Sequence, residues 1–351
     1  MKRRDYRKMK KKTSKSRLAI KIGLVVSLTA LLAIATYGLS LHQKAEQAVD
    51  RAYEAVPATQ KSEIRGEAKV EPAKDNVSLL LIGVDDSDAR QGNSRSDALI
   101  VATFNPEEKS VKMLSIPRDS YVYIPKVGYK DRINHAHAFG GTHAAIETVE
   151  EMLDIPIDYY VKMNFNAFIE VVDALGGVEV EVPYNRLEKD ENDRNTIQLK
   201  KGVHTLDGRH ALALARTRMA DSDIERGKRQ QMIMQAIIKE MVSVKSITKY
   251  GDVIEAVGDN MKTDMTFKEM TSFWEYAKGG MPKIDTINLK GDDDWSRGPY
   301  YYKLDANDLE NVSQLLKAHL DLIPDSSSLT DSSNSNVIGT ADKTADGSDD
   351  Y

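Results

Sequence analysis

Three short apolar runs between Ser78 and Arg118 constrain the fold of this chain more than any other feature. They cover residues 79–84, 98–104 and 111–116, and each has the length and composition of a buried strand. A polar, Gly-containing loop separates the first run from the second, and the turn-forming pair Asn105-Pro106 follows the second. The sequence therefore predicts three consecutive strands, the last two joined by a tight hairpin.

Charged side chains stand at or beside the ends of these runs. Asp85 follows the first run, Arg95 and Asp97 precede the second, and Arg118 follows the third. Strand ends are where α/β proteins place ligands. Carboxylates beside arginines suit a hard cation together with a phosphate. Taken singly, each residue is equally compatible with an ion pair that caps a strand, whereas the cluster as a whole favours a site.

Strand-like and helix-like segments alternate through the following residues. Strands are expected at 121–126, 157–163, 178–182 and near 284–289, and helices at 143–153, 165–175, 206–214 and 224–244, with two more beyond 245. Asn164 and Gly176-Gly177 are the expected start and stop signals of the second helix. Residues 129–137 are expected to form a loop and residues 184–204 an exposed excursion. The pattern predicts an α/β fold, a mixed β-sheet sandwiched between helices in three α-β-α layers.

Further arginines lie downstream. If residues 215–218 are extended, Arg216 and Arg218 point to the same face, because side chains alternate along a strand. At 100° per residue, Arg226 and Gln230 fall on the apolar, core-facing stripe of the helix expected at 224–244. A charge that points inward is costly unless it is paired. Either a buried carboxylate or a bound anion must therefore meet Arg226.

The N-terminal segment predicts a membrane anchor. Residues 1–17 hold ten Lys or Arg and one acidic residue, and the rest of the chain has a net charge of −14. The segment 18–41 is apolar and has no charge from Ile22 onward, which is enough to span a bilayer. Basic residues on one flank place the N-terminus in the cytoplasm. We expect a single-pass type II protein of the cell membrane, although a cleaved signal peptide would give the body the same topology.

The composition excludes several classes of function. An acidic body argues against non-specific binding of nucleic acid, which requires a basic surface. The absence of Cys removes thiol catalysis and Cys-ligated zinc. The expected organisation is a basic cytoplasmic tail at 1–17, the anchor at 18–41, a stalk or linker at 42–75, an extracytoplasmic folded domain at 76–324 and a disordered acidic tail at 325–351.

Several motifs, in this order and at this spacing, resemble the LytR-CpsA-Psr family of Gram-positive envelope proteins. The resemblance covers residues 76–245, together with the short cytoplasmic tail and the single anchor. The motifs that support it are GVD at 83–85, RSD at 95–97, SIPRD at 115–119, RINHAHAFGG at 132–141, ARTR at 215–218 and D-x-x-R-x-x-x-Q from Asp223 to Gln230.

Such a resemblance implies a magnesium-dependent transferase at the outer face of the cytoplasmic membrane. Its substrates would be an anionic polymer, such as a wall teichoic acid, on an undecaprenyl-diphosphate carrier, and the C6 hydroxyl of N-acetylmuramic acid in peptidoglycan. The product would be a phosphodiester. No nucleic-acid partner is implied. The family fold includes a hydrophobic pocket for the polyprenyl chain, which we expect between the helices around 144–153, 165–175 and 233–241.

The resemblance also implies roles for individual residues. Asp85 and Asp97 match the carboxylates that bind Mg²⁺, for which Mn²⁺ is a possible substitute. The diphosphate clamp would consist of Arg118, Arg216, Arg218 and Arg226, supported by Arg95, Arg132 and Gln230. The general base that activates the sugar hydroxyl would be Asp223, or Asp97 through its metal site. The expected catalytic set is therefore Arg118, Asp97 and Asp223.

Two other functions use the same residues. A hydrolase would release the polymer or cleave the polyprenyl diphosphate with water as the acceptor. A non-catalytic envelope sensor or transcriptional attenuator would bind the lipid intermediate without turnover and without a strict need for magnesium. The presence of both Asp85 and Asp97 counts against the second alternative.

Overall fold

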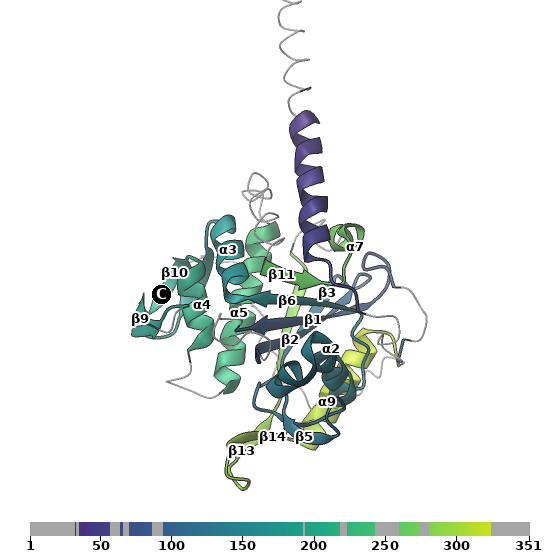
Figure 1. Cartoon of the computed structure of the whole chain (residues 1–351), viewed down its shortest axis with the longest axis vertical. Coiled ribbons are helices and arrows are strands. Elements are labelled where there is room, and N and C mark those ends of the chain that lie inside the picture. The colour runs from purple at the N-terminus through teal and green to yellow at the C-terminus, as the bar shows by residue number, and fades with distance from the viewer. Residues whose placement is uncertain are drawn as a thin grey trace, which may run out of the picture. The chain divides into compact units, whose positions relative to one another are not determined.

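A six-stranded mixed sheet forms the centre of the computed structural model (Figure 1). The structure describes residues 32, 35–56, 64–65, 70–85, 94–191, 194–217, 223–242, 260–273 and 281–323. The strand order is β11-β6-β1-β2-β3-β12. The strands are β1 (Val77–Val84), β2 (Ser96–Asn105), β3 (Ser110–Ser115), β6 (Tyr159–Asn164), β11 (Met261–Thr263) and β12 (Lys283–Asn288).

The first three strands form an antiparallel meander, as the apolar runs and the Asn105-Pro106 turn predict. β6 and β12 then add in parallel to β1 and β3 respectively, and β11 adds antiparallel to β6. The predicted mixed sheet is therefore confirmed. Because β1 is buried on both faces, its sequence is apolar at nearly every position rather than alternating.

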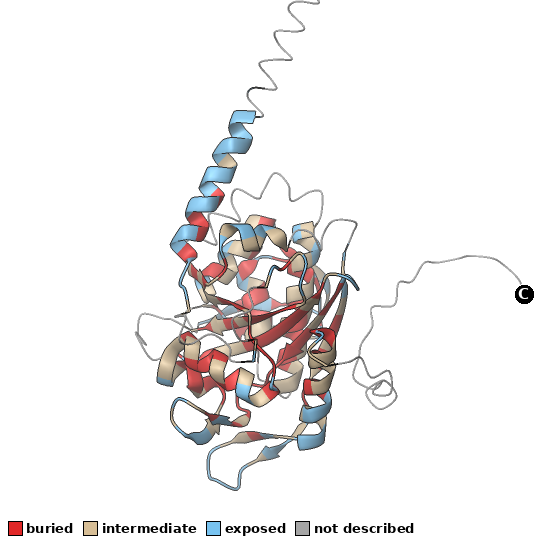
Figure 2. Cartoon of the chain, turned by 90° about the vertical axis from the view of Figure 1, so that its right-hand side faces the viewer, coloured by how far each residue is buried: buried red, intermediate tan, exposed pale blue. Residues whose placement is uncertain are grey.

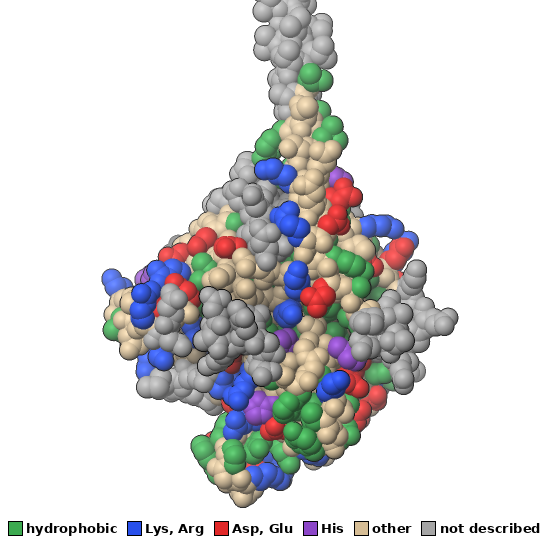
Figure 3. Space-filling view, viewed as in Figure 1, with side chains coloured by type: hydrophobic (Ala, Val, Ile, Leu, Met, Phe, Trp, Pro, Cys, Tyr) green, Lys and Arg blue, Asp and Glu red, His purple; other side chains and the backbone are tan. Residues whose placement is uncertain are grey.

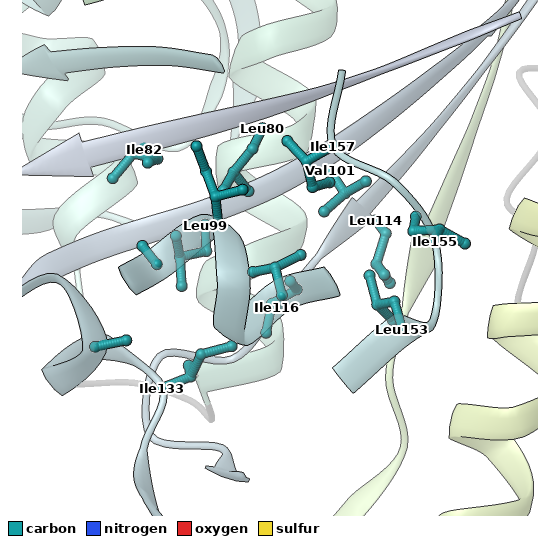
Figure 4. Packing of buried hydrophobic residues seen from close by; sticks show 14 of the residues in the cluster. Leu80, Ile82, Leu99, Val101, Leu114, Ile116, Ile133, Leu153, Ile155 and Ile157 are labelled. Carbon is teal, nitrogen blue, oxygen red and sulfur yellow. The ribbon is translucent and has the colours of Figure 1, made fainter. Parts of the chain in front are cut away.

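Helices cover both faces of this sheet. On one face lie α2 (Asn134–Leu153) and α9 (Ala306–His319). Their apolar side chains pack with those of β1, β2 and β3 in the largest core cluster (Figure 4). Leu80, Leu99 and Leu114 in this cluster are at most 1% exposed, and each such burial contributes about 2 kcal/mol.

The opposite face is covered by α3 (Phe165–Leu175) and α5 (Asp223–Val242), with α4 (Gly208–Arg216) packed against both. Met234 and Ile238 of α5 pack on Ile100 and Met113 of the sheet. In Figure 2 the strands are mostly red, which shows that helices or hairpins shield them from solvent on both faces. The predicted three-layer α-β-α arrangement is confirmed.

Outside the central sheet, the described residues form four two-stranded antiparallel sheets. They are β4 (Tyr121–Ile124) with β5 (Tyr129–Arg132), β7 (Val178–Val182) with β10 (Gly202–Leu206), β8 (Arg186–Lys189) with β9 (Asn195–Leu199), and β13 (Gly291–Asp294) with β14 (Tyr301–Leu304). Residues 184–204, expected to form an exposed excursion, are largely exposed where the structure describes them, and most of them belong to paired strands.

The prediction of a loop at 129–137 is wrong. Residues 129–132 form β5, and α2 begins at Asn134 rather than near residue 143. The helix is interrupted where Gly140 and Gly141 leave helical geometry, and Gly141 has φ +68°. By contrast, α3 begins and ends as predicted. The Asn164 side chain accepts a hydrogen bond from the Ala167 N–H, and Gly176 has a left-handed φ of +85°.

The chain divides into two compact units, residues 1–47 and 48–351. Residues 35–47 are helical in the first unit. Most of the predicted anchor at 18–41 lies outside the described residues, as does the predicted disordered tail at 325–351. In the part of the chain that the structure describes, no helix combines the length and apolarity that crossing a membrane requires.

The buried imidazole of His319 predicts a loss of stability in acid. Its ring nitrogens lie 2.7 Å from the Thr103 hydroxyl and 2.8 Å from the Ser110 hydroxyl. Burial, assisted by the charge of Lys112, lowers the pKa of His319 from 6.5 to about 4, although Glu108 opposes the shift. The unfolded chain therefore binds more protons than the folded chain between these two pH values. The stabilisation is complete above pH 6.5 and declines as the pH falls through this window.

Below pH 4 the loss from this group should reach about 3 kcal/mol in the free energy of unfolding. Urea unfolding at pH 7.5 and pH 5 measures the part of this loss, about 2 kcal/mol, that is expected at pH 5, and the matched variant His319→Gln should show a smaller difference between the two pH values. An equal difference in wild type and variant would contradict the assignment.

Candidate active site

A β-bulge presents Asp97 at the end of the sheet. In the β1–β2 register, Gly83 faces Ala98 while Val84 faces Ser96, so Asp97 is the extra residue between them. Bulges bend a strand and redirect the side chain of the extra residue. Asp85 follows β1 directly and is half-buried. The two predicted metal carboxylates thus lie at the ends of adjacent strands.

Arg118, which follows β3, lies among three carboxylates. Its Nη1 donates a hydrogen bond to Asp97 Oδ1 at 2.8 Å. Its Nε lies 3.3 Å from Asp119 Oδ2 and 3.8 Å from Asp223 Oδ1, and its backbone N–H donates to Asp223 Oδ2 at 3.0 Å. Burial opposes the charge of Arg118, but Asp119, Asp97 and Asp223 outweigh it and raise its pKa. The guanidinium is therefore a stable positive charge that balances all three carboxylates and hydrogen-bonds Asp97.

Asp119 extends this cluster, although it was not among the predicted site residues. It is 9% exposed, and its Oδ1 lies 3.7 Å from Nε of Arg132. Arg132 also donates from Nε to the Tyr300 carbonyl at 2.9 Å. Asp119 thus joins Arg118 to Arg132. Its place directly after Arg118 in the SIPRD motif was the available signal.

Arg226 points inward from α5, as the helical angle predicts, and is 4% exposed. Its Nη1 lies 3.7 Å from Asp223 Oδ1, and its Nε donates to the Ala215 carbonyl at 3.3 Å. Gln230, one turn further on, donates to the same carbonyl at 3.4 Å. The positive charge of Arg226 is therefore partly balanced by Asp223. A carboxylate was one of the two partners predicted for it.

Arg216 is the last residue of α4, so the premise that residues 215–218 are extended is wrong at this position. Its guanidinium lies 4.4 Å from the centre of the Phe165 ring, and its Nη1 donates to the Asp190 carbonyl at 2.9 Å. These contacts hold Arg216 over the start of α3. Arg218 lies outside the described residues.

An apolar pocket opens beside this charged cluster. It lies between the sheet and helices α3, α4 and α5, and its walls include Phe168, Ile233 and Met234. The polar side chains that line it are Asp97, Asn164, Arg216, Arg226 and Gln230. A mostly apolar pocket with a few converging polar groups is typical of a ligand site. Of the three helix segments expected to line it, 144–153 does not, because this part of α2 packs on the opposite face of the sheet.

The remaining predicted residues lie around this centre. Arg95 is exposed two residues before Asp97. His135 and His137, expected in a loop, belong to α2. Nδ1 of His135 is 2.8 Å from Asp131 Oδ2, and Nδ1 of His137 is 2.8 Å from the Ser94 carbonyl. Among the described residues, no group of three or more His, Cys, Asp or Glu is placed to hold a metal ion.

Comparison with known proteins identifies the family. The model of the LytR_cpsA_psr family matches residues 39–318. The chain belongs to the LytR_cpsA_psr family. A family relative, the polyisoprenyl-teichoic acid–peptidoglycan teichoic acid transferase TagT of Bacillus subtilis, is 38% identical over 328 residues, which are 91% of this chain and 99% of TagT. The polyisoprenyl-teichoic acid–peptidoglycan teichoic acid transferase TagU of Halalkalibacterium halodurans is 39% identical over 306 residues, which are 86% of this chain and 98% of TagU.

Solved structures of LytR_cpsA_psr proteins share the fold. One of TagT bound to LIIa-WTA has a TM-score of 0.66 at 40% identity and covers 76% of this chain and 99% of that chain. Another, of TagT with bound octaprenyl pyrophosphate lipid, has a TM-score of 0.62 at 37% identity, with the same two coverages. The resemblance inferred from the motifs is confirmed at the level of family and fold.

Close packing at Gly227 positions the charged end of α5. A Cβ atom at Gly227 would stand 2.5 Å from the Ser115 hydroxyl oxygen on β3, well inside contact distance. We expect Gly227→Ala to lower the free energy of unfolding by about 1–3 kcal/mol, because the helix must move off the sheet. The double variant Gly227→Ala with Ser115→Ala should recover part of this loss, since the obstructing oxygen is gone. Urea unfolding of the four proteins measures the coupling, and additive losses would contradict the packing argument.

Proposed function

We propose that this protein transfers an anionic cell-wall polymer, such as a wall teichoic acid, from an undecaprenyl-diphosphate carrier to the C6 hydroxyl of N-acetylmuramic acid in peptidoglycan. The supporting observation is the apolar pocket with Asp97, Arg216 and Arg226 among its lining residues. A long apolar chain that ends in a diphosphate has this same division into apolar and charged parts. The TagT structure with bound octaprenyl pyrophosphate lipid adds support from a relative.

The arginines would bind the diphosphate and stabilise charge as the phosphoryl group moves. Phosphoryl transfer depends mainly on positioning and on charge neutralisation. The planar guanidinium forks of Arg216 and Arg226 can each bind two phosphate oxygens. Arg118 holds Asp97 beside them. Gln230 supplies an uncharged donor on the same wall, one turn beyond Arg226.

Asp85 and Asp97 would hold Mg²⁺, with Mn²⁺ as a possible substitute. The donor set fits this ion, because Mg²⁺ takes one or two carboxylates and completes its shell with phosphate oxygens and water. Asp85 follows the end of β1, and Asp97 lies at the start of the adjacent strand β2. Arg118 balances the charge of Asp97. When bound, the ion would supply positive charge that polarises the phosphate oxygens.

Asp223 is the proposed general base. The Arg118 N–H fixes its carboxylate at the start of α5, where the side chain is 14% exposed. It would take the proton of the sugar hydroxyl as the new oxygen–phosphorus bond forms and the bond to the polyprenyl phosphate breaks. The leaving group is then the polyprenyl monophosphate. Asp97 is the alternative base, and full transfer activity in Asp223→Ala would eliminate Asp223.

The proposed location follows from the charge pattern at the N-terminus. A basic tail at 1–17 before an apolar segment at 18–41 predicts a single-pass anchor with the catalytic domain outside the cytoplasm. The substrates proposed above are found on that side of the membrane. The domain bounds 76–324 belong to the same proposal.

A direct test mixes the full-length protein in detergent with a lipid-linked teichoic-acid precursor, uncrosslinked peptidoglycan and Mg²⁺. Covalently linked polymer that disappears with EDTA would support the transferase. Free phosphopolymer without linkage would favour a hydrolase. Lipid binding with neither product, in an assay where an active relative works, would favour a sensor.

A further inference from the structure

A large aromatic side chain projects into solvent from the turn between β13 and β14. Trp295 is 65% exposed, and its ring centre lies 5.0 Å from that of Tyr300. Exposing a tryptophan forfeits the burial of a large apolar surface, so such side chains often belong to binding surfaces. None of the catalytic roles proposed above uses Trp295.

Behind Trp295, two arginines flank a pair of tyrosines in a stack that joins two hairpins. The Arg297 guanidinium lies 4.4 Å from the centre of the Tyr121 ring, which meets the Tyr301 ring edge-on at 4.9 Å. The Arg132 guanidinium lies 5.2 Å from the centre of the Tyr301 ring. The four residues therefore hold the β13–β14 hairpin firmly against β4.

The stack leads directly to the charged cluster. Arg132 contacts Asp119, Asp119 contacts Arg118, and Arg118 contacts Asp97 at the pocket. The backbone repeats this link, because the Tyr300 carbonyl accepts a hydrogen bond from Arg132 and the Tyr302 N–H donates to the Asp119 carbonyl. A molecule that rests on Trp295 would therefore have its neighbouring part close to the proposed base.

The two substrate regions lie on opposite sides of this cluster. The apolar pocket is built by α3, α4 and α5, whereas β4 packs on α2 and β14 packs on β4. In Figure 1 the β13–β14 hairpin lies near β5 at the lower end, apart from α3 and α4, and Figure 3 shows hydrophobic and basic side chains together in that region. The proposed lipid donor would occupy the pocket at α3, α4 and α5, which we call the donor side. The β13–β14 hairpin with Trp295 then forms a second side, which remains for another substrate.

The charge of the second side also limits its occupant. The hairpin 291–304 carries three carboxylates and two basic residues, with Asp292 opposite Lys303 and Asp294 paired with Arg297. It therefore offers no excess of positive charge to a polyanion, so the transferred polymer is a poor occupant. A glycan of N-acetylated sugars is a suitable one, because its rings present apolar C–H faces to an aromatic ring while its hydroxyl and amide groups donate to carboxylates.

We propose that Trp295, with the Arg297–Tyr121–Tyr301–Arg132 stack behind it, forms a binding subsite for the acceptor glycan strand of peptidoglycan. This inference rests on the proposed transferase function. The subsite would position the sugar hydroxyl beside Asp223 by holding the neighbouring sugars of the strand.

Kinetics with full-length protein in detergent test the subsite. We expect Trp295→Ala to raise the KM for uncrosslinked glycan chains about tenfold, with the KM for the lipid-linked donor unchanged. Trp295→Phe, which keeps an aromatic face, should recover most of the acceptor affinity. Tyr53→Ala removes another exposed aromatic side chain, 45% exposed, from a different region and should match wild type. An unchanged acceptor KM in Trp295→Ala would overturn the proposal.

A binding measurement separates this inference from the proposed function. The chain has two tryptophans, so a Trp274→Phe background leaves Trp295 as the fluorescent probe. Soluble glycan chains should change its emission in a saturable way, and a teichoic-acid polymer alone should not. If wild type releases polymer without linking it, the transferase proposal fails, and this titration still decides the subsite. A flat titration with glycan overturns the subsite even in an active enzyme.

Discussion

Replacing Arg118 with alanine is expected to lower the rate of polymer transfer by about a thousandfold or more. The side chain lies within 3.8 Å of Asp97, Asp119 and Asp223. Its loss leaves three carboxylates close together without their shared counter-charge, so they repel one another and repel the substrate diphosphate. Removing one partner from a buried ionic cluster also costs about 3–5 kcal/mol of stability. Transfer assays and thermal unfolding of the same preparation measure the two effects.

Arg118→Lys separates charge from geometry. Lysine keeps the positive charge but cannot contact Asp97 and Asp119 with separate nitrogens of one rigid fork. We expect this variant to recover much of the stability and little of the transfer rate. If Arg118→Lys transferred polymer at the wild-type rate, the role given to the guanidinium fork would be wrong.

Replacing Asp97 with asparagine is expected to abolish transfer to a similar degree. Asparagine keeps the size of the side chain at the bulge but removes the negative charge that pairs with Arg118 and that would hold Mg²⁺. The residual activity should therefore lose its response to EDTA and to added Mg²⁺. Rates at several Mg²⁺ concentrations, for wild type and variant, give this comparison.

Asp285→Asn is the matched control for this change. Asp285 is another aspartate of the central sheet, more deeply buried than Asp97, and it pairs with Lys112 at 3.3 Å. It lies on β12 opposite Lys112, away from the end of β3 that leads to Arg118. We expect Asp285→Asn to lower stability and leave the transfer rate and its Mg²⁺ response intact. Equal losses of activity in both variants would show that the Asp97 effect is structural.

The sequence predicted the parts of the fold that depend on local patterns. The apolar runs gave β1, β2 and β3, and Asn164 and Gly176 gave the two ends of α3. The helical angle gave the inward direction of Arg226. These features depend on neighbours within one turn or one strand, so a single sequence contains enough information to predict them.

The parts that failed depend on distant partners. Residues 129–132 are polar and form β5 only because they pair with β4. The helical start of α2 was obscured by Gly140 and Gly141, whose non-helical geometry breaks the periodic pattern. Asp119 was missed because its importance comes from Arg132, which a separate hairpin brings to it. The sequence indicated which charged residues lie near one another, but it did not show the contacts that connect them.

The close approach of Gly227 to Ser115 is the first of two successive points that hold α5 to the sheet. One turn further on, the buried Gln231 amide donates hydrogen bonds to the Met113 and Ile287 carbonyls at 3.0 and 2.8 Å. Arg226 and Gln230 each precede one of these points by a single residue, so the sheet fixes the positions from which both side chains extend. We therefore expect any adjustment of the pocket to a bound molecule to come from its apolar side chains rather than from a movement of this part of α5.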